Sequence, residues 1–158
     1  MYGIYKGKKY RVAKISTFYR VISGEKEEGF EEYIDILGEK RPDIFVKDVD
    51  IHELDYLYEV KYEFLYRGHY FKALSTMIRK LIDKDYFEIS AGIEKYDLIE
   101  KLGFKRLDES TWWKDIRRKD IEALKIVEEP LGIFKDRGSK VKILEGKAID
   151  DFLASVKD

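Results

Sequence analysis

The sequence predicts an α+β fold made of two tandem copies of one unit, each running β-hairpin/strand, helix, strand and short helix, with a mainly antiparallel sheet. Three observations predict this fold: an internal repeat, apolar–polar alternation around two glycine turns, and helical apolar spacing that ends in Leu-Gly. The 158 residues are enough for one domain with its own core. We therefore expect a single compact domain over residues 1–158.

The internal repeat is the most informative of these observations. Blocks of residues recur in the same order further along the chain: 5–7 as 66–68, 16–20 as 75–79, 37–43 as 102–108, and 45–49 as 112–116. We expect internal repeats at 1–60 and 61–128. Residues 132–138 and 140–143 resemble the opening of the first repeat, so 129–158 is expected to be a C-terminal capping segment, whose hairpin completes the sheet.

Each repeat should open with a hairpin, because period-two alternation flanks Lys6-Gly7 at 5–12 and Arg67-Gly68 at 64–74. The β-branched and aromatic residues at 17–22 and 77–82 predict a further strand in each repeat. In the second repeat, residues 80–89 could also form a hairpin that turns at 83–85.

A helix should follow in each repeat. Residues 93–102 place apolar side chains on one face, and Gly103 is a natural C-cap. The corresponding helix of the first repeat is predicted at 29–37, with Gly38 as its end. Strands at 44–49 and 111–116 come next, and each leads into a short helix. The expected core residues in and around these elements are Phe45, Leu54, Leu57, Ile121 and Leu124.

Composition excludes several classes of site. The chain has no Cys, so disulfides, thiolate metal sites and Cys nucleophiles are excluded. Its two histidines, His52 and His69, lack partners at ligand or catalytic spacing, and no nucleotide-binding or hydrolase motif is present. We therefore expect no enzyme activity, no cofactor, no metal and no small-molecule substrate. The absence of a long apolar run or a signal-peptide core predicts a cytoplasmic protein without a membrane partner.

Charge is unevenly distributed although the formal net charge is only −1. Residues 1–22 carry basic side chains and no acid, whereas residues 23–60 carry thirteen acidic and four basic residues. The predicted partner-binding residues are the acids on and before the first predicted helix: Glu25, Glu27, Glu28, Glu31, Glu32 and Asp35. A solvated helix face is the alternative interpretation. In the binding interpretation, these acids meet a cationic surface on a partner.

The tryptophan pair Trp112-Trp113 lies in a predicted strand. Successive side chains of a strand face opposite sides, so we expect one of the two in the core and the other exposed or at an interface. Trp is enriched among the residues that dominate binding energy. Trp113 is therefore the remaining predicted partner-binding residue.

The order of motifs over residues 1–128 resembles small cytosolic immunity proteins of bacterial polymorphic or contact-dependent toxin systems. The motifs concerned are the Tyr-(Lys/Arg)-Gly hairpin, Leu-Gly, and (Phe/Trp)-x-Lys-Asp-(Val/Ile) followed by a short Leu-bearing helix. This resemblance implies a protein that binds a cognate toxin domain, often a nuclease, and blocks its active site. We expect a non-catalytic protein-binding protein of this kind, whose oligomeric state the sequence does not define.

Two other functions stay open. The basic N-terminal hairpin region contains Tyr2, Tyr5, Tyr10 and Tyr19, which could stack bases in a single-stranded nucleic-acid-binding module. The neighbouring acidic segment opposes that function, so nucleic acid is not the expected partner. A hydrolase could use a close pair among the carboxylates Asp48, Asp50, Glu53 and Asp55, although a chain this rich in acids places some of them close together by chance.

Overall fold

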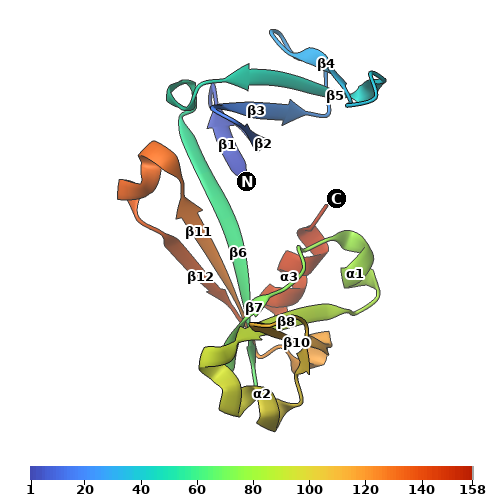
Figure 1. Cartoon of the computed structure of the whole chain (residues 1–158), viewed down its shortest axis with the longest axis vertical. Coiled ribbons are helices and arrows are strands. Elements are labelled where there is room, and N and C mark those ends of the chain that lie inside the picture. The colour runs from blue at the N-terminus through green and yellow to red at the C-terminus, as the bar shows by residue number, and fades with distance from the viewer. Residues whose placement is uncertain (158) are drawn as a thin grey trace. The chain divides into compact units, whose positions relative to one another are not determined.

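The computed structural model describes residues 1–157, which form a mainly antiparallel sheet of 12 strands with a few short helices (Figure 1). The chain divides into two compact units. Unit 1 contains Met1–Val60 and Glu128–Lys140, and unit 2 contains Lys61–Val127 and residues 141–157. Within residues 1–157, no helix combines the length and apolarity needed to cross a membrane.

Unit 1 consists of strands and two 3₁₀ turns. Its elements are β1 (Tyr2–Tyr5), β2 (Lys8–Ile15), β3 (Phe18–Ser23), β4 (Glu31–Ile34), β5 (Lys40–Val49), a 3₁₀ turn (Ile51–Glu53), the start of β6 (Tyr56–Tyr66) and a second 3₁₀ turn (Gly132–Arg137). The strands pair antiparallel in the order β4-β5-β3-β2-β1-β6. Among residues 1–157, β4 therefore has a paired neighbour on one side only.

Unit 2 combines strands with three short α-helices. Its elements are the end of β6, β7 (His69–Ala73), α1 (Arg79–Asp83), β8 (Phe87–Gly92), α2 (Tyr96–Leu102), β9 (Lys105–Arg106), β10 (Thr111–Ile116), most of β11 (Ala123–Pro130), β12 (Lys140–Leu144) and α3 (Lys147–Ser155), with 3₁₀ turns at Ile93–Lys95 and Arg118–Asp120. The strand order is β6-β7-β8-β10-β9, and β11 pairs with β6 and β12. Strand β9, like β4, has one paired neighbour.

The two predicted hairpins are confirmed, as β1–β2 and β6–β7. Lys6 and Gly7 have φ of 48° and 77°, and Arg67 and Gly68 have φ of 49° and 79°. Two consecutive central residues with positive φ define the type I′ turn, whose twist matches that of the flanking strands. The glycine at the second position explains why both turns are visible in the sequence.

Each unit has its own hydrophobic core. The buried residues of unit 1 include Phe45, Leu54 and Leu57, and those of unit 2 include Ile121 and Leu124. These five residues confirm the predicted core. The strands predicted at 17–22, 44–49 and 111–116 are present as β3, β5 and β10. The helix predicted at 93–102 is also confirmed, and its C-cap Gly103 adopts a left-handed conformation with φ of 72°.

The predicted helix at 29–37 is wrong, because this segment forms β4 and the turn after it. The apolar residues that fit helical spacing are Phe30, Tyr33, Ile34 and Leu37. Of these, only Phe30 is buried; its ring stacks on Tyr10 with centroids 5.6 Å apart. Pairing of β4 with the next strand β5 and this aromatic contact with Tyr10 together override the local helical pattern.

The strand predicted at 77–82 and the hairpin at 80–89 are also wrong, because Arg79–Asp83 forms α1. Arg79 pairs with Asp83 one helical turn away, at 2.8 Å. Its guanidinium also donates to the carbonyl oxygen of Leu153 at the end of α3, at 2.7 Å. Met77 and Ile82 pack against the unit 2 core. A strand assignment based on β-branched content misses these contacts because most of them are tertiary.

The opening hairpin predicted within 129–158 is wrong as well. Residues 132–137 form a 3₁₀ turn, and the following strand β12 pairs with β11. Helix α3, which the sequence reading did not predict, then packs Ile149 and Leu153 into the unit 2 core.

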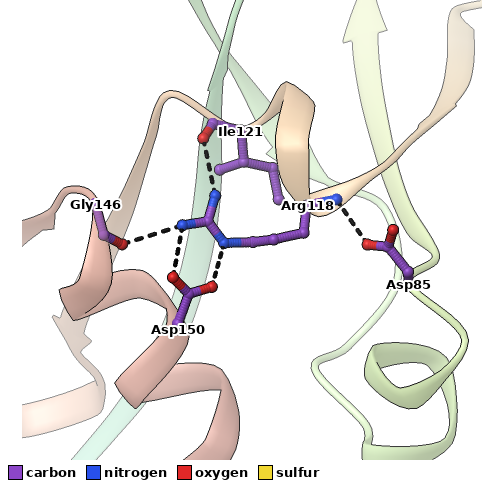
Figure 2. A network of polar contacts seen from close by, with 5 residues as sticks. All are labelled: Asp85, Arg118, Ile121, Gly146 and Asp150. Carbon is purple, nitrogen blue, oxygen red and sulfur yellow. Dashed lines mark hydrogen bonds and ion pairs between the residues drawn. The ribbon is translucent and has the colours of Figure 1, made fainter.

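Arg118 fixes α3 within unit 2 (Figure 2). Its guanidinium donates to both carboxylate oxygens of Asp150, at 2.7 and 3.2 Å, and to the carbonyl oxygens of Gly146 and Ile121. Its backbone N–H donates to the Asp85 carboxylate at 2.7 Å. A guanidinium that binds a carboxylate bidentately holds its partner in one geometry. The start of α3 is therefore tied to the 3₁₀ turn before β11.

Candidate functional site

The β4–β5 tip, defined as residues 34–39, exposes three aliphatic side chains. Ile36 is 98% exposed, Leu37 is 80% exposed and Ile34 is 55% exposed. Isolated surface aliphatics are ordinary, but a group of them that is almost fully in water is typical of a binding surface. Ile34 and Leu37 lie within the predicted helix at 29–37, whose apolar spacing conceals this exposed group.

Asp35 holds the tip in a single turn. Its carboxylate accepts hydrogen bonds from the N–H groups of Leu37 and Glu39, at 2.9 and 3.0 Å, and lies 3.5 Å from the Arg41 guanidinium. The Gly38 N–H donates to the Asp35 carbonyl oxygen at 3.0 Å. The Glu39 N–H, followed by the Leu37 N–H and Arg41, holds the pKa of the Asp35 carboxyl below its usual range. The two aliphatic side chains are therefore presented on an ordered turn.

A signal for this turn exists in the sequence. Asp at the first position and Gly at the fourth are typical of a type I turn, and Asp35 and Gly38 occupy those positions. The bond from Gly38 to Asp35 closes the turn. The helical spacing of the neighbouring apolar residues obscured it.

The predicted acidic residues divide into two groups. Glu25, Glu28, Glu31 and Glu32 are exposed, and Glu31 and Glu32 belong to β4 itself. Glu32 lies 3.7 Å from the Lys40 ammonium, an exposed ion pair of small energetic weight. Glu25 and Glu28 lie in the segment before β4, and we call these four exposed carboxylates the acidic rim.

Glu27 and Asp35 instead have structural partners. Glu27 accepts hydrogen bonds from Lys8 at 2.8 Å, from the Tyr10 hydroxyl at 2.5 Å and from the Ser23 hydroxyl at 2.8 Å. These bonds, led by the one from Lys8, lower the pKa of the Glu27 carboxyl to about 2. Burial, with a further contribution from the bond to Glu27, raises the pKa of Tyr10. Glu27 thus ties the first hairpin to the segment before β4.

Replacing Glu27 with Gln should reduce the acid sensitivity of unit 1. The folded-state pKa of about 2 lies below the ordinary value of 4.5, so the ionised carboxylate stabilises the fold above pH 4.5 and loses that effect as the pH falls toward 2. Glu27→Gln should lower the melting temperature at pH 7 and flatten its decline between these pH values. Thermal melts across that range test this, with Glu25→Gln as control; equal slopes for wild type and Glu27→Gln would contradict it.

The remaining predicted site residue, Trp113, belongs to unit 2. The expectation that one Trp of the pair packs in the core is met in part, by Trp112, although both Trp112 and Trp113 are only half-buried. Trp112 packs against the unit 2 core, and Lys105 lies over the Trp113 ring at 5.8 Å. The cation covers one face of Trp113, a contact that itself stabilises the ring position.

The carboxylates considered for hydrolysis make local structural contacts. Asp48 binds Arg20 bidentately at 2.7 and 2.9 Å, which lowers the pKa of its carboxyl. Asp50 and Glu53 form the capping box of a 3₁₀ turn, and Asp55 accepts from the Gly7 N–H at 3.0 Å. Among residues 1–157, no group of three His, Asp or Glu side chains is placed to hold a metal ion.

In the basic hairpin considered for nucleic-acid binding, several side chains already contact other residues of the protein. Tyr5 and Tyr10 are buried in the unit 1 core, and Lys8 is bound to Glu27. Lys9 lies over the Tyr2 ring at 4.5 Å. Stacking of bases needs an exposed aromatic face. Tyr19 packs against the unit 1 core, so of the four tyrosines named from the sequence only Tyr2 neither belongs to that core nor packs against it.

Comparison with known proteins identifies a family. A family model described as "Uncharacterised conserved protein UCP033725" matches residues 1–131, which include both predicted repeats and the β4–β5 tip. A search of curated proteins found no match, and neither did a search of solved structures.

Proposed function

Since the chain belongs to the family of uncharacterised conserved proteins UCP033725, whose description gives no activity, we propose from its geometry that it is a non-catalytic protein-binding protein. It binds a cationic surface of another protein through the β4–β5 tip and the acidic rim. The observation that carries this proposal is the exposure of Ile36 and Leu37, 98% and 80%, on a turn fixed by Asp35.

The arrangement of the tip matches the physics of tight protein interfaces. A few apolar anchors supply most of the binding energy, and the charged groups around them supply association rate and selectivity. In this proposal, Ile36 and Leu37 are the apolar anchors, and the acidic rim supplies the charged groups. Because the Asp35 hydrogen bonds already fix the turn, little conformational entropy is lost when a partner binds.

Strand β4 adds a second element of recognition. It pairs with β5 on one side only, so its other side offers backbone N–H and C=O groups to an added strand. A depression of about 370 Å³ lies over β3, β5 and β4, lined by charged residues that include Arg20, Glu31, Glu32 and Lys47. A partner that adds a strand to the free edge of β4 could also reach these charged side chains.

For the identity of the partner, we propose a cognate toxin domain that the protein neutralises by stoichiometric binding. The proposal combines the resemblance to immunity proteins with the acidic rim. A nuclease cleft that binds phosphates is cationic, and an acidic surface can block it by charge complementarity. Co-expression tests this directly: the protein should restore growth to cells that produce its partner, and the β4–β5 tip should be required.

We further infer that units 1 and 2 descend from one duplicated unit. Support comes from the two strand orders, β4-β5-β3-β2-β1-β6 and β9-β10-β8-β7-β6-β11. At every position, the strand in the second order is numbered five higher than the strand in the first, so the two halves of the sheet are connected in the same way. Equivalent bonds also recur: the Gly7 N–H donates to the Asp55 carboxylate at 3.0 Å, and the Gly68 N–H donates to the Glu122 carboxylate at 3.3 Å.

Reversing two charges of the acidic rim tests the proposed function. Glu28→Lys/Glu32→Lys should slow association with the partner and weaken its salt dependence, because long-range attraction is lost. The partner is identified as a protein captured by the wild type, and the association rates of the wild type and the variant are then measured with purified proteins. The matched control is Glu109→Lys/Asp136→Lys, which changes the net charge equally at exposed acids elsewhere. Equal association rates for the variant and the wild type would refute the role of the rim.

A further inference from the structure

The two edge strands of the sheet carry opposite charges at equivalent positions. Strands β5 and β10 contain the aligned sequence blocks 45–49 and 112–116, and β4 and β9 pair with them. Glu31 lies opposite Val46, and Lys105 lies opposite the matching residue Trp113. The neighbouring pairs agree, since Glu32 lies opposite Phe45 and Arg106 opposite Trp112. Glu31-Glu32 of unit 1 thus corresponds to Lys105-Arg106 of unit 2.

The residues just before each edge strand support this correspondence independently. Phe30 stacks on Tyr10 of the first hairpin, with ring centroids 5.6 Å apart, and Phe104 packs on Phe71 of the second hairpin, with centroids 5.0 Å apart. Each phenylalanine follows a glycine with positive φ, Gly29 or Gly103. The reversal of charge between β4 and β9 therefore falls on equivalent positions of two similar local structures.

Both edge strands are open to pairing. Strands β4 and β9 are the two ends of the strand order, and each has one paired neighbour. Exposed aliphatic residues follow both: Ile34 and Ile36 at the end of β4, and Leu107, 51% exposed, directly after β9. An open edge beside exposed apolar side chains is a site where another strand can add.

The signs of the charges on β4 and β9 indicate which strand could add to each open edge. Like charges on both edges would keep copies of the chain apart, which is the usual protection of open edges. Here the acidic edge of one copy and the basic edge of another attract. We propose that the chain self-associates head to tail, with β4 of one copy adding to β9 of a second copy and Glu31-Glu32 facing Lys105-Arg106.

This inference goes beyond the proposed function because it assigns β9, an element of unit 2, and names a second copy of the chain as its occupant. It also has a distinct consequence. A head-to-tail interface uses different surfaces on the two copies, so association need not stop at a dimer and should extend with concentration. Because the charges are exposed, salt should oppose it.

A charge-swap experiment on the full chain tests the inference. The all-basic variant Glu31→Lys/Glu32→Arg and the all-acidic variant Lys105→Glu/Arg106→Glu each carry like charges on both edges. Sedimentation velocity over a range of concentrations should show wild-type association that salt weakens, and each variant alone should associate at least about tenfold more weakly. An equimolar mixture of the two variants should assemble again, because it restores opposite charges across the interface.

Far-UV circular dichroism and thermal melts of both variants check that these surface changes leave the fold intact. A wild type that is monomeric at every concentration overturns the inference, and so does association that either variant leaves unchanged. A mixture that stays monomeric overturns it too. The all-acidic variant keeps β4 and the β4–β5 tip, so at concentrations where the wild type is monomeric its binding to the protein partner should equal that of the wild type. The self-association and the proposed function can therefore be contradicted separately.

Discussion

Replacing Ile36 and Leu37 together with serine should weaken partner binding by about 100-fold or more and leave the melting temperature nearly unchanged. Each side chain is almost wholly in water in the free protein, so the fold loses no packing when it is shortened. In the complex, each becomes an apolar anchor, and truncation of such an anchor costs about 2 kcal/mol or more, which is over tenfold in affinity. Titration calorimetry with the purified partner measures this effect.

The matched control for this variant is Ile133→Ser/Val141→Ser. Ile133 is 52% exposed and Val141 is 58% exposed, and neither belongs to the β4–β5 tip. The control should bind as the wild type does. If Ile36→Ser/Leu37→Ser binds equally well, the anchors lie elsewhere and the proposed site is wrong.

Truncation of Leu54 or Ile121 to Ala should lower the free energy of unfolding by about 2–5 kcal/mol, as large-to-small substitutions in a packed core do. Both residues are only 4% exposed, and each directly follows a 3₁₀ turn. Leu54 packs in the unit 1 core and Ile121 in the unit 2 core. Chemical denaturation followed by fluorescence measures the change.

An exposed leucine provides the comparison for these core variants. Leu107 is 51% exposed, so Leu107→Ala should change the unfolding free energy by less than about 0.5 kcal/mol. A loss below about 1 kcal/mol for Leu54→Ala or Ile121→Ala would place that residue outside the tightly packed core.

The parts of the fold that the sequence predicts are those with a local cause. The Lys6-Gly7 and Arg67-Gly68 turns need left-handed backbone, and glycine makes that requirement visible. Helix α2 combines apolar spacing with a glycine C-cap. These features depend on neighbours in sequence, so pattern reading finds them.

The parts that the sequence does not predict depend on distant contacts. Residues 29–37 have helical spacing, but pairing with β5 and the stacking of Phe30 on Tyr10 make part of them a strand. Helix α1 needs the bond from Arg79 to Leu153, which is far along the chain. The same limit applies to the candidate site: the acids of the rim were visible as a charge cluster, whereas Ile36 and Leu37 were hidden by the helical assignment.

The proposed duplication gives different alignments in sequence and in space. Sequence comparison matches the Leu-Gly pairs at 37–38 and 102–103. In the structure, Gly103 caps α2 and precedes Phe104, whereas Gly38 lies in the β4–β5 tip. The residue that precedes Phe30 in the same way is Gly29. An alignment by strand pairing therefore matches Gly103 with Gly29 and not with Gly38. The opposite charges of β4 and β9 are visible only in this alignment.

The most direct test of the central claim is hydrogen–deuterium exchange of the protein alone and bound to its purified partner. Binding through the β4–β5 tip should slow exchange of backbone amides over residues 31–39, because an added partner covers the free edge of β4 and the turn. Glu31 and Tyr33 lie on the strand, and Ile36 lies on the turn, so peptides that contain them report the two parts. Protection confined to other segments, with unchanged exchange over residues 31–39, would contradict the account.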